Sequence, residues 1–80
     1  MPVVLRQGGF RLVIYYQDHQ PPHTHVYKAG TEVVINLGDE ANSPYVRNTN
    51  GMNPKNVKRA LQIADDYQSY LLERWDEING

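Results

Sequence analysis

The sequence contains no cysteine among its 80 residues, and it contains no long hydrophobic run. Without cysteine, neither disulfides nor a thiolate metal site can stabilise so short a chain, which leaves a non-thiolate metal or oligomerisation. The N-terminal stretch MPVVLRQGGF has no signal-peptide or membrane-spanning pattern. We therefore expect one soluble, cytoplasmic domain over residues 1–80 that contacts no membrane, with a homodimer as one way to extend its core.

The chain also has little net charge, because eight basic residues are balanced by nine acidic ones, which gives a formal charge of −1. This balance provides no global attraction to nucleic acid or to anionic lipid. Information about partners therefore comes from local clusters of charge.

Two hydrophobic periods divide the chain into a strand-forming part and a helical part. Alternating β-branched and aromatic residues predict strands at about 3–6, 10–16, 23–28 and 32–37, with a further short edge strand at 45–47. Asn53 followed by Pro54 is typical of a helix start, and apolar residues at three- and four-residue spacing predict one helix over about 54–78. The predicted fold class is α+β: a small antiparallel sheet of three to five strands with one long C-terminal helix packed on one face.

Strand alternation assigns the side chains of the sheet to two faces. We expect the helix to cover the apolar side chains of Phe10, Leu12, Ile14, Val26, Val33, Ile35 and Leu37. We expect the opposite face to be open, and it would carry Arg11, Val13, Tyr15, His23, His25, Tyr27, Val34 and Asn36. This mixed face is too apolar for a purely solvated surface and too polar for a core.

The stretch DHQPPHTH, residues 18–25, holds all three histidines of the chain together with an aspartate and two prolines. The prolines restrict the backbone, so the connection is stiff, and stiffness holds side chains in place at low entropic cost. His23 and His25 point to the same side of a strand, and Asp18 and His19 can turn back over them. We therefore predict a site at this loop.

Three interpretations of the loop remain open from the sequence alone. The histidines can be structural, hydrogen-bonded groups in a rigid connection, with Asp18 capping a turn. His19, His23 and His25, with or without Asp18, can bind a divalent transition metal such as zinc, although H-x3-H-x-H matches no diagnostic zinc motif. Alternatively, His23 or His25 is a catalytic acid or base oriented by Asp18 and His19, while Arg11 holds an anion. Since no serine or cysteine nucleophile lies nearby, that chemistry would suit phosphodiester cleavage through the 2′-hydroxyl of the substrate.

Two further groups of side chains are candidates for ligand contact. Tyr15 and Tyr27 flank the histidines, and they either pack across strands or form a stacking platform for a planar ligand. A basic stretch without any acidic residue is made up of Arg47, Lys55, Lys58 and Arg59. Basic residues at a helix start oppose the helix dipole, so this stretch is either a tolerated cost or an anion-binding surface for phosphate or RNA.

The pattern GFR…Y..DH.PPH.HV, followed by N..G…P..V..AL.I…..LL..W.E..G, resembles a family of small bacterial proteins classed as a domain of unknown function. The resemblance covers nearly the whole chain, and its first part is carried by Gly9, Phe10, Arg11, Asp18, His19, Pro21, Pro22, His23, His25 and Val26. It implies a short cytoplasmic protein, often encoded beside a second small uncharacterised protein in an arrangement that suggests a toxin–antitoxin pair. It implies no established activity.

From these observations we predict a toxin–antitoxin-like component that binds or acts on RNA or another phosphate-bearing partner through the histidine-rich loop. The alternatives are a non-enzymatic protein-interaction module with structural histidines and a divalent-metal-binding protein. Whether the protein is an enzyme stays open. A small cognate protein is a further predicted partner, because the acidic second half of the helix suits a basic protein surface.

Overall fold

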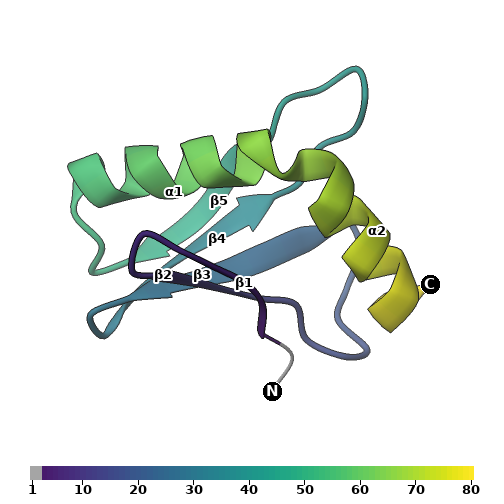
Figure 1. The fold of residues 1–80 in the computed structure, drawn as a ribbon, viewed down its shortest axis with the longest axis horizontal. Coiled ribbons are helices and arrows are strands. Elements are labelled where there is room, and N and C mark those ends of the chain that lie inside the picture. The colour runs from purple at the N-terminus through teal and green to yellow at the C-terminus, as the bar shows by residue number, and fades with distance from the viewer. Residues whose placement is uncertain (1–2) are drawn as a thin grey trace.

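The structure, a computed structural model, describes residues 3–80 and contains a five-stranded antiparallel sheet and two helices (Figure 1). The strands pair in chain order, so each strand lies beside the next one in the sequence. The elements are β1 (Val3–Gln7), β2 (Phe10–Val13), β3 (His23–Lys28), β4 (Thr31–Asn36), β5 (Tyr45–Asn50), α1 (Pro54–Asp66) and α2 (Gln68–Asn79). The prediction of an α+β fold with a small antiparallel sheet is confirmed.

Tight turns fix the register of the first four strands. Gly8 and Gly9, with φ of 57° and 84°, connect β1 to β2, and Ala29 and Gly30 connect β3 to β4. Strand β2 ends at Val13, three residues earlier than predicted, so the segment 14–22 is a long connection to β3. Strand β5 instead continues to Asn50, beyond the predicted end at residue 47.

The C-terminal segment forms two helices rather than the single long helix that the hydrophobic period predicts. Helix α1 begins as expected, because the Asn53 side chain accepts a hydrogen bond of 2.8 Å from the Asn56 N–H. The helix is interrupted at Tyr67, with φ of −111° and ψ of 20°. Directly after it, the Gln68 side-chain amide donates to three backbone carbonyls in the connection between β4 and β5. These bonds stabilise a bend that the hydrophobic period of the sequence cannot predict.

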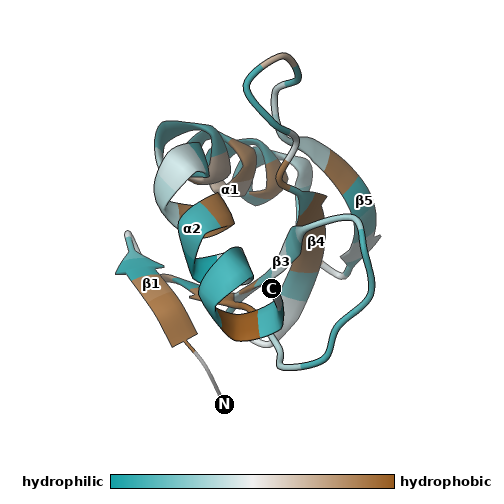
Figure 2. Ribbon diagram, turned by 90° about the vertical axis from the view of Figure 1, so that its right-hand side faces the viewer, coloured by the Kyte–Doolittle hydropathy of each residue, from teal (hydrophilic) through white to brown (hydrophobic). Residues whose placement is uncertain are grey.

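The bend turns α2 past one end of the sheet, while α1 covers the face (Figures 1 and 2). All seven side chains predicted for the helix-covered face are buried, and they pack with Ala60, Ala64, Leu71 and Trp75 from the two helices. In residues 3–80, neither helix is long and apolar enough to cross a membrane.

The prediction that the opposite sheet face is open is only partly right: Arg11, Tyr15, His25 and Tyr27 keep part of their surface exposed, but the other four side chains do not. Val13, His23, Val34 and Asn36 on that face are all buried, with exposed fractions of 8% or less. One reason is the bend, because it places Trp75 beside His23, with ring centroids 5.2 Å apart. The segment 14–22 adds further cover to this end of the sheet, and a half-buried site results.

Candidate functional site

The long connection between β2 and β3 is tied to the end of α2, and this tie places Asp18. The Asp18 N–H donates to Asn79 Oδ1 at 3.0 Å, and Asn79 Nδ2 donates to the Tyr15 carbonyl at 3.0 Å. Further along, the Gln20–Pro21 peptide bond is cis, and the Pro22 carbonyl accepts from the Leu37 N–H at 2.9 Å. The Asp18 carboxylate therefore lies over the first residues of β3.

A compact cluster forms there from one carboxylate and two imidazoles. Asp18 Oδ2 lies 2.8 Å from His23 Nε2 and 3.5 Å from His25 Nε2. A carboxylate oxygen of Asp18 and one ring nitrogen from each histidine lie within 4.8 Å of one another. His19 stays outside this cluster: its side chain is exposed, and only its backbone N–H takes part, donating to Asp18 Oδ1 at 2.8 Å.

The other ring nitrogen of each histidine faces an acceptor. His23 Nδ1 lies 2.9 Å from the Pro21 carbonyl oxygen, and His25 Nδ1 lies 2.7 Å from Glu32 Oε2. Because a carbonyl and a carboxylate only accept, each Nδ1 must carry the hydrogen. In the neutral ring, the lone pair is then on Nε2, so two imidazole lone pairs and the Asp18 carboxylate converge on one point.

Glu32 is a member of the site that sequence reasoning missed. It lies on β4 opposite Tyr27, one diagonal step from His25 on the same face of the β3–β4 hairpin. The two-residue turn Ala29-Gly30 carried the signal, because such a short turn fixes which residues of the two strands lie opposite each other.

Asp18 is held in its charged form. Partial burial alone would raise the pKa of its carboxyl, but the hydrogen bond from the His19 N–H and the neighbouring His23 outweigh that effect, so the pKa is lowered. Tyr27 is held in its neutral form, because burial, the hydrogen bond with Tyr15 and the nearby Glu32 carboxylate all raise its pKa. The cluster therefore carries negative charge and lacks a phenolate.

Aromatic rings form the walls of the site and leave one side accessible. Trp75 packs on His23, which is 2% exposed, whereas His25 and Asp18 each keep 21% of their side-chain surface. The rings of Tyr15 and Tyr27 contact His25, and their hydroxyl oxygens are 2.7 Å apart. The hydrogen bond between the two hydroxyls holds both tyrosine rings beside the imidazole of His25, and together they form one wall of the site.

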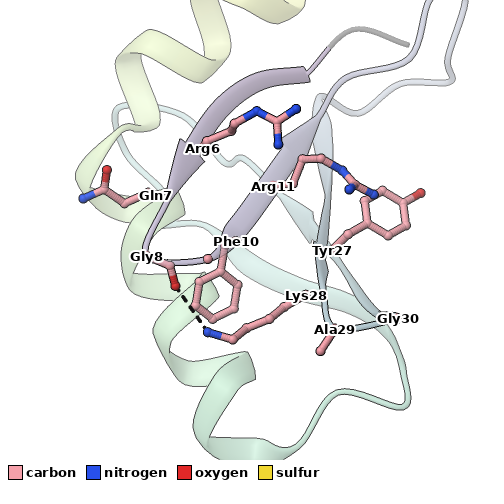
Figure 3. A pocket seen from close by; sticks show the side chains of 10 residues that line it. Arg6, Gln7, Gly8, Phe10, Arg11, Tyr27, Lys28, Ala29 and Gly30 are labelled. Carbon is pink, nitrogen blue, oxygen red and sulfur yellow. Dashed lines mark hydrogen bonds between the residues drawn. The ribbon is translucent and has the colours of Figure 1, made fainter.

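Arg11 lies farther along the same face, outside the cluster. Its guanidinium carbon is 5.2 Å from the centre of the Tyr27 ring, and Tyr27 in turn stacks on His25 with ring centroids 6.4 Å apart. Figure 3 shows the guanidinium reaching toward Tyr27 from the neighbouring strand. Arg11 is therefore close to the cluster but is separated from it by one aromatic ring.

The four predicted anion-binding cations do not form one surface. Arg47 lies on β5, where its guanidinium donates to the Pro21 carbonyl at 3.4 Å. Lys55, Lys58 and Arg59 are all exposed on α1. Lys58 lies beside Ser43 and Pro44, whereas Arg59 lies beside Gly8 and Phe10 at the β1–β2 hairpin.

A family model described as a domain of unknown function (DUF4160) matches residues 9–76. No curated protein and no solved structure matches the chain significantly. The matched range contains the complete loop and both histidines of the cluster, but it ends before Asn79.

Proposed function

The chain belongs to this family of unknown function, and we propose that it binds one divalent transition-metal ion through Asp18, His23 and His25, with zinc the first candidate. The observation that carries the proposal is the orientation of the two imidazoles. Both Nδ1 atoms face protein acceptors, so in the neutral rings both Nε2 lone pairs point at Asp18. Metal-binding histidines characteristically have such partners, because a bond at one nitrogen fixes the tautomer that offers the other nitrogen to the metal.

The charges of the site favour a cation at the same point. Two carboxylates, Asp18 and Glu32, contact the two rings, and they contribute two negative charges. Two protons could balance them only by making both rings imidazolium, and His23 is almost fully buried under Trp75. One divalent ion balances the same charge and leaves both rings neutral.

The spacing of the ligand atoms fits a small ion. Two ligands of a tetrahedral zinc, each about 2.1 Å from the metal, lie about 3.4 Å apart. The two distances to Asp18 Oδ2, 2.8 and 3.5 Å, lie on either side of this value. Three protein ligands leave a coordination position open, and the accessible side at His25 and Asp18 would give that position to water or a ligand.

Zinc titration of untagged protein stripped with a chelator tests this proposal. We expect one bound ion per chain and a higher melting temperature, since zinc at one hundred times its dissociation constant stabilises the fold by about 2.7 kcal/mol. Cobalt(II) substituted for zinc would report the geometry through its visible absorption, which separates four-coordinate from six-coordinate sites.

Two of the histidines, with Asp18 and Glu32, provide a matched set of variants. His25→Ala and Asp18→Asn should abolish the stabilisation by zinc, and Glu32→Gln should weaken binding about 10- to 100-fold, as expected when a group that orients a ligand is altered. His19→Ala removes an exposed imidazole of the same loop and should bind zinc like the wild type. Equal binding by His25→Ala and His19→Ala, or no binding by the wild type, would contradict the proposal.

A second candidate function is the predicted acid–base cleavage of RNA by a toxin–antitoxin-like component. It is favoured by the 2.7 Å contact between His25 Nδ1 and Glu32, because a carboxylate in this place orients an imidazole for proton transfer at its other nitrogen, and His25 keeps 21% of its side-chain surface. Incubation of RNA with chelator-treated protein separates the two ideas. Cleavage that persists without metal and disappears in His25→Ala would support the acid–base mechanism, and cleavage by neither protein would remove it.

A further inference from the structure

A second group of cations without carboxylate partners lies at the end of the sheet, in a hollow between two hairpin turns. Figure 3 shows Arg6 and Arg11 on neighbouring strands and Lys28 near the Gly8-Gly9 turn. All of these residues line one pocket, which Tyr27 also borders. None of the residues within 3–80 that line it is acidic.

The two arginines are placed against each other without compensation. Arg6 and Arg11 are cross-strand partners in the β1–β2 ladder. Like charges in such a pair are destabilising, and no ion pair among residues 3–80 includes either arginine. The repulsion between these two positive charges would be relieved by a bound anion.

Arg11 also has a buried donor without an acceptor. Its Nε atom is inaccessible to solvent and has no hydrogen-bond partner. A buried N–H in this state is costly, and native proteins satisfy nearly all of them. Because Nε itself is inaccessible, a phosphate would contact the two terminal nitrogens of the guanidinium, which also offer a pair of parallel donors.

Lys28 adds a third positive charge at the end of the sheet, but its side chain lies on the face of Phe10, opposite the face of Arg11 and Tyr27. Its ammonium donates to the Gly8 carbonyl at 3.2 Å and lies 4.4 Å from the centre of the Phe10 ring. An ammonium has three donors, so two remain for a ligand. A Cβ at Gly9 would lie 3.2 Å from Lys28 Nζ, so glycine at this position leaves room for the ammonium.

We propose that this pocket binds the phosphate group of a nucleotide or of RNA, with Arg6 and Arg11 as the contacts. The pocket lies on the same strands as the Asp18–His23–His25 cluster, and only the Tyr27 ring separates Arg11 from His25. The idea that this pocket holds the substrate of that cluster depends on the proposed metal centre. The idea that the pocket binds phosphate does not depend on the metal.

The Nε–H resonance of Arg11 in isotope-labelled protein gives a direct readout. The probes are inorganic phosphate, adenosine monophosphate and a short single-stranded oligoribonucleotide. We expect this resonance to shift on titration, with affinity falling as salt rises because the contact is ionic. Binding of the oligoribonucleotide at least tenfold tighter than the mononucleotide would assign the site to RNA, and similar affinities would assign it to a single phosphate group.

Matched arginine variants separate the pocket from the general charge of the protein. Arg6→Gln and Arg11→Gln should weaken phosphate binding at least tenfold, and Arg11→Lys should also weaken it, since a lysine keeps the charge but loses the fork. Arg74→Gln removes the same charge from an arginine of α2 that already pairs with Glu77, and it should have no effect. Equal losses in Arg11→Gln and Arg74→Gln, or an Arg11 resonance that no probe shifts, would overturn the inference.

Repeating the titration with chelator and with His25→Ala distinguishes this inference from the proposed metal centre. Phosphate binding that survives both treatments supports the pocket whether or not the wild type binds zinc. Zinc binding without any phosphate binding would overturn the pocket and leave the metal centre intact.

Discussion

The histidine loop and the start of α1 each hold several charged or titratable side chains close together in the sequence, but only the loop brings them together in space. His23 and His25 alternate on one strand and meet Asp18 at 2.8 and 3.5 Å. Lys58 and Arg59, adjacent on a helix, line different hollows. Neighbours on a helix diverge by about 100°, whereas residues two apart on a strand share a face.

The two regions differ in their long-range support as well. The loop is held by Asn79, 61 residues from Asp18 along the chain, and by the packing of Trp75 on His23. The cap of α1 is local, since the Asn53 side chain accepts from the Asn56 N–H and its carbonyl accepts from the Val57 N–H. A site that converges in this protein therefore depends on its tertiary contacts, and variants of those contacts test the comparison.

Replacing Trp75 should have the largest effect. Trp75→Ala would remove a side chain that is 1% exposed, at a cost of roughly 3–5 kcal/mol, which is enough to unfold so small a domain. Trp75→Phe keeps one ring and should fold, with a loss of about 1–2 kcal/mol and weaker zinc binding, because His23 loses part of its support. Urea unfolding and zinc titration measure the two effects.

Leu61→Ala is the matched control for Trp75→Phe, since this leucine packs on the core from helix α1 and is not part of the metal cluster. It should lower stability without changing zinc affinity. If both variants lowered zinc affinity in proportion to their loss of stability, the special support of the loop by Trp75 would be disproved.

Asn79→Ala should have a smaller effect on stability but a selective effect on the site. It removes the two hydrogen bonds to Asp18 and Tyr15, which contribute about 0.5–1.5 kcal/mol each. Because these bonds position Asp18, zinc affinity should fall even in protein that is fully folded by circular dichroism.

Asn79→Asp sharpens this test, because it keeps an acceptor for the Asp18 N–H but loses the donor to Tyr15 and adds a negative charge. We expect its zinc affinity to lie between those of wild type and Asn79→Ala. An unchanged affinity in both variants would show that the end of α2 has no part in positioning Asp18.

The sequence was sufficient for the parts of the fold and site that follow a local period. Alternation correctly placed the core rows and put His23 and His25 on one face, and the Asn53-Pro54 start was correct. The break at Tyr67 was missed because the Gln68 bonds that stabilise it come from a distant connection. Every feature that depends on this break was missed with it, including the cover over His23.

The residues of the site also divide into those that a local sequence pattern predicts and those that it does not. The sequence allowed Asp18 to turn back over the histidines, and the structure places it there. His19 was assigned with it, but in a connection without a backbone period nothing in the sequence says which of two adjacent side chains turns inward. Glu32 and Asn79 reach the site through strand pairing and helix docking, which lie beyond a local period.

Reversing the charge at the start of α1 should give a modest gain in stability. Lys55→Glu places a carboxylate at the positive end of the helix dipole, which is worth about 0.3–1 kcal/mol at low salt. Zinc affinity should not change, because Lys55 is exposed and is not a member of the cluster. A loss of stability that salt does not relieve would contradict the electrostatic account of this region.

The smallest expected effect compares Asp18 with the other turn aspartate, Asp39. Hydrogen bonds from the Ala41 N–H and the Asn42 side chain hold the pKa of Asp39 below its usual value of 3.8. A pKa lowered on folding adds stability above the unfolded value, and this contribution disappears as pH falls through the lower folded value. Asp39→Asn should therefore unfold with a weaker acid dependence than wild type below about pH 5 in urea titrations. Since Asp39 bonds to Ala41 and Asn42 and to neither histidine of the cluster, the same variant should bind zinc normally. A weakened zinc affinity would mean that a turn carboxylate contributes to the metal site through the charge of the protein as a whole. The distinction between a converged cluster and an isolated turn residue would then fail.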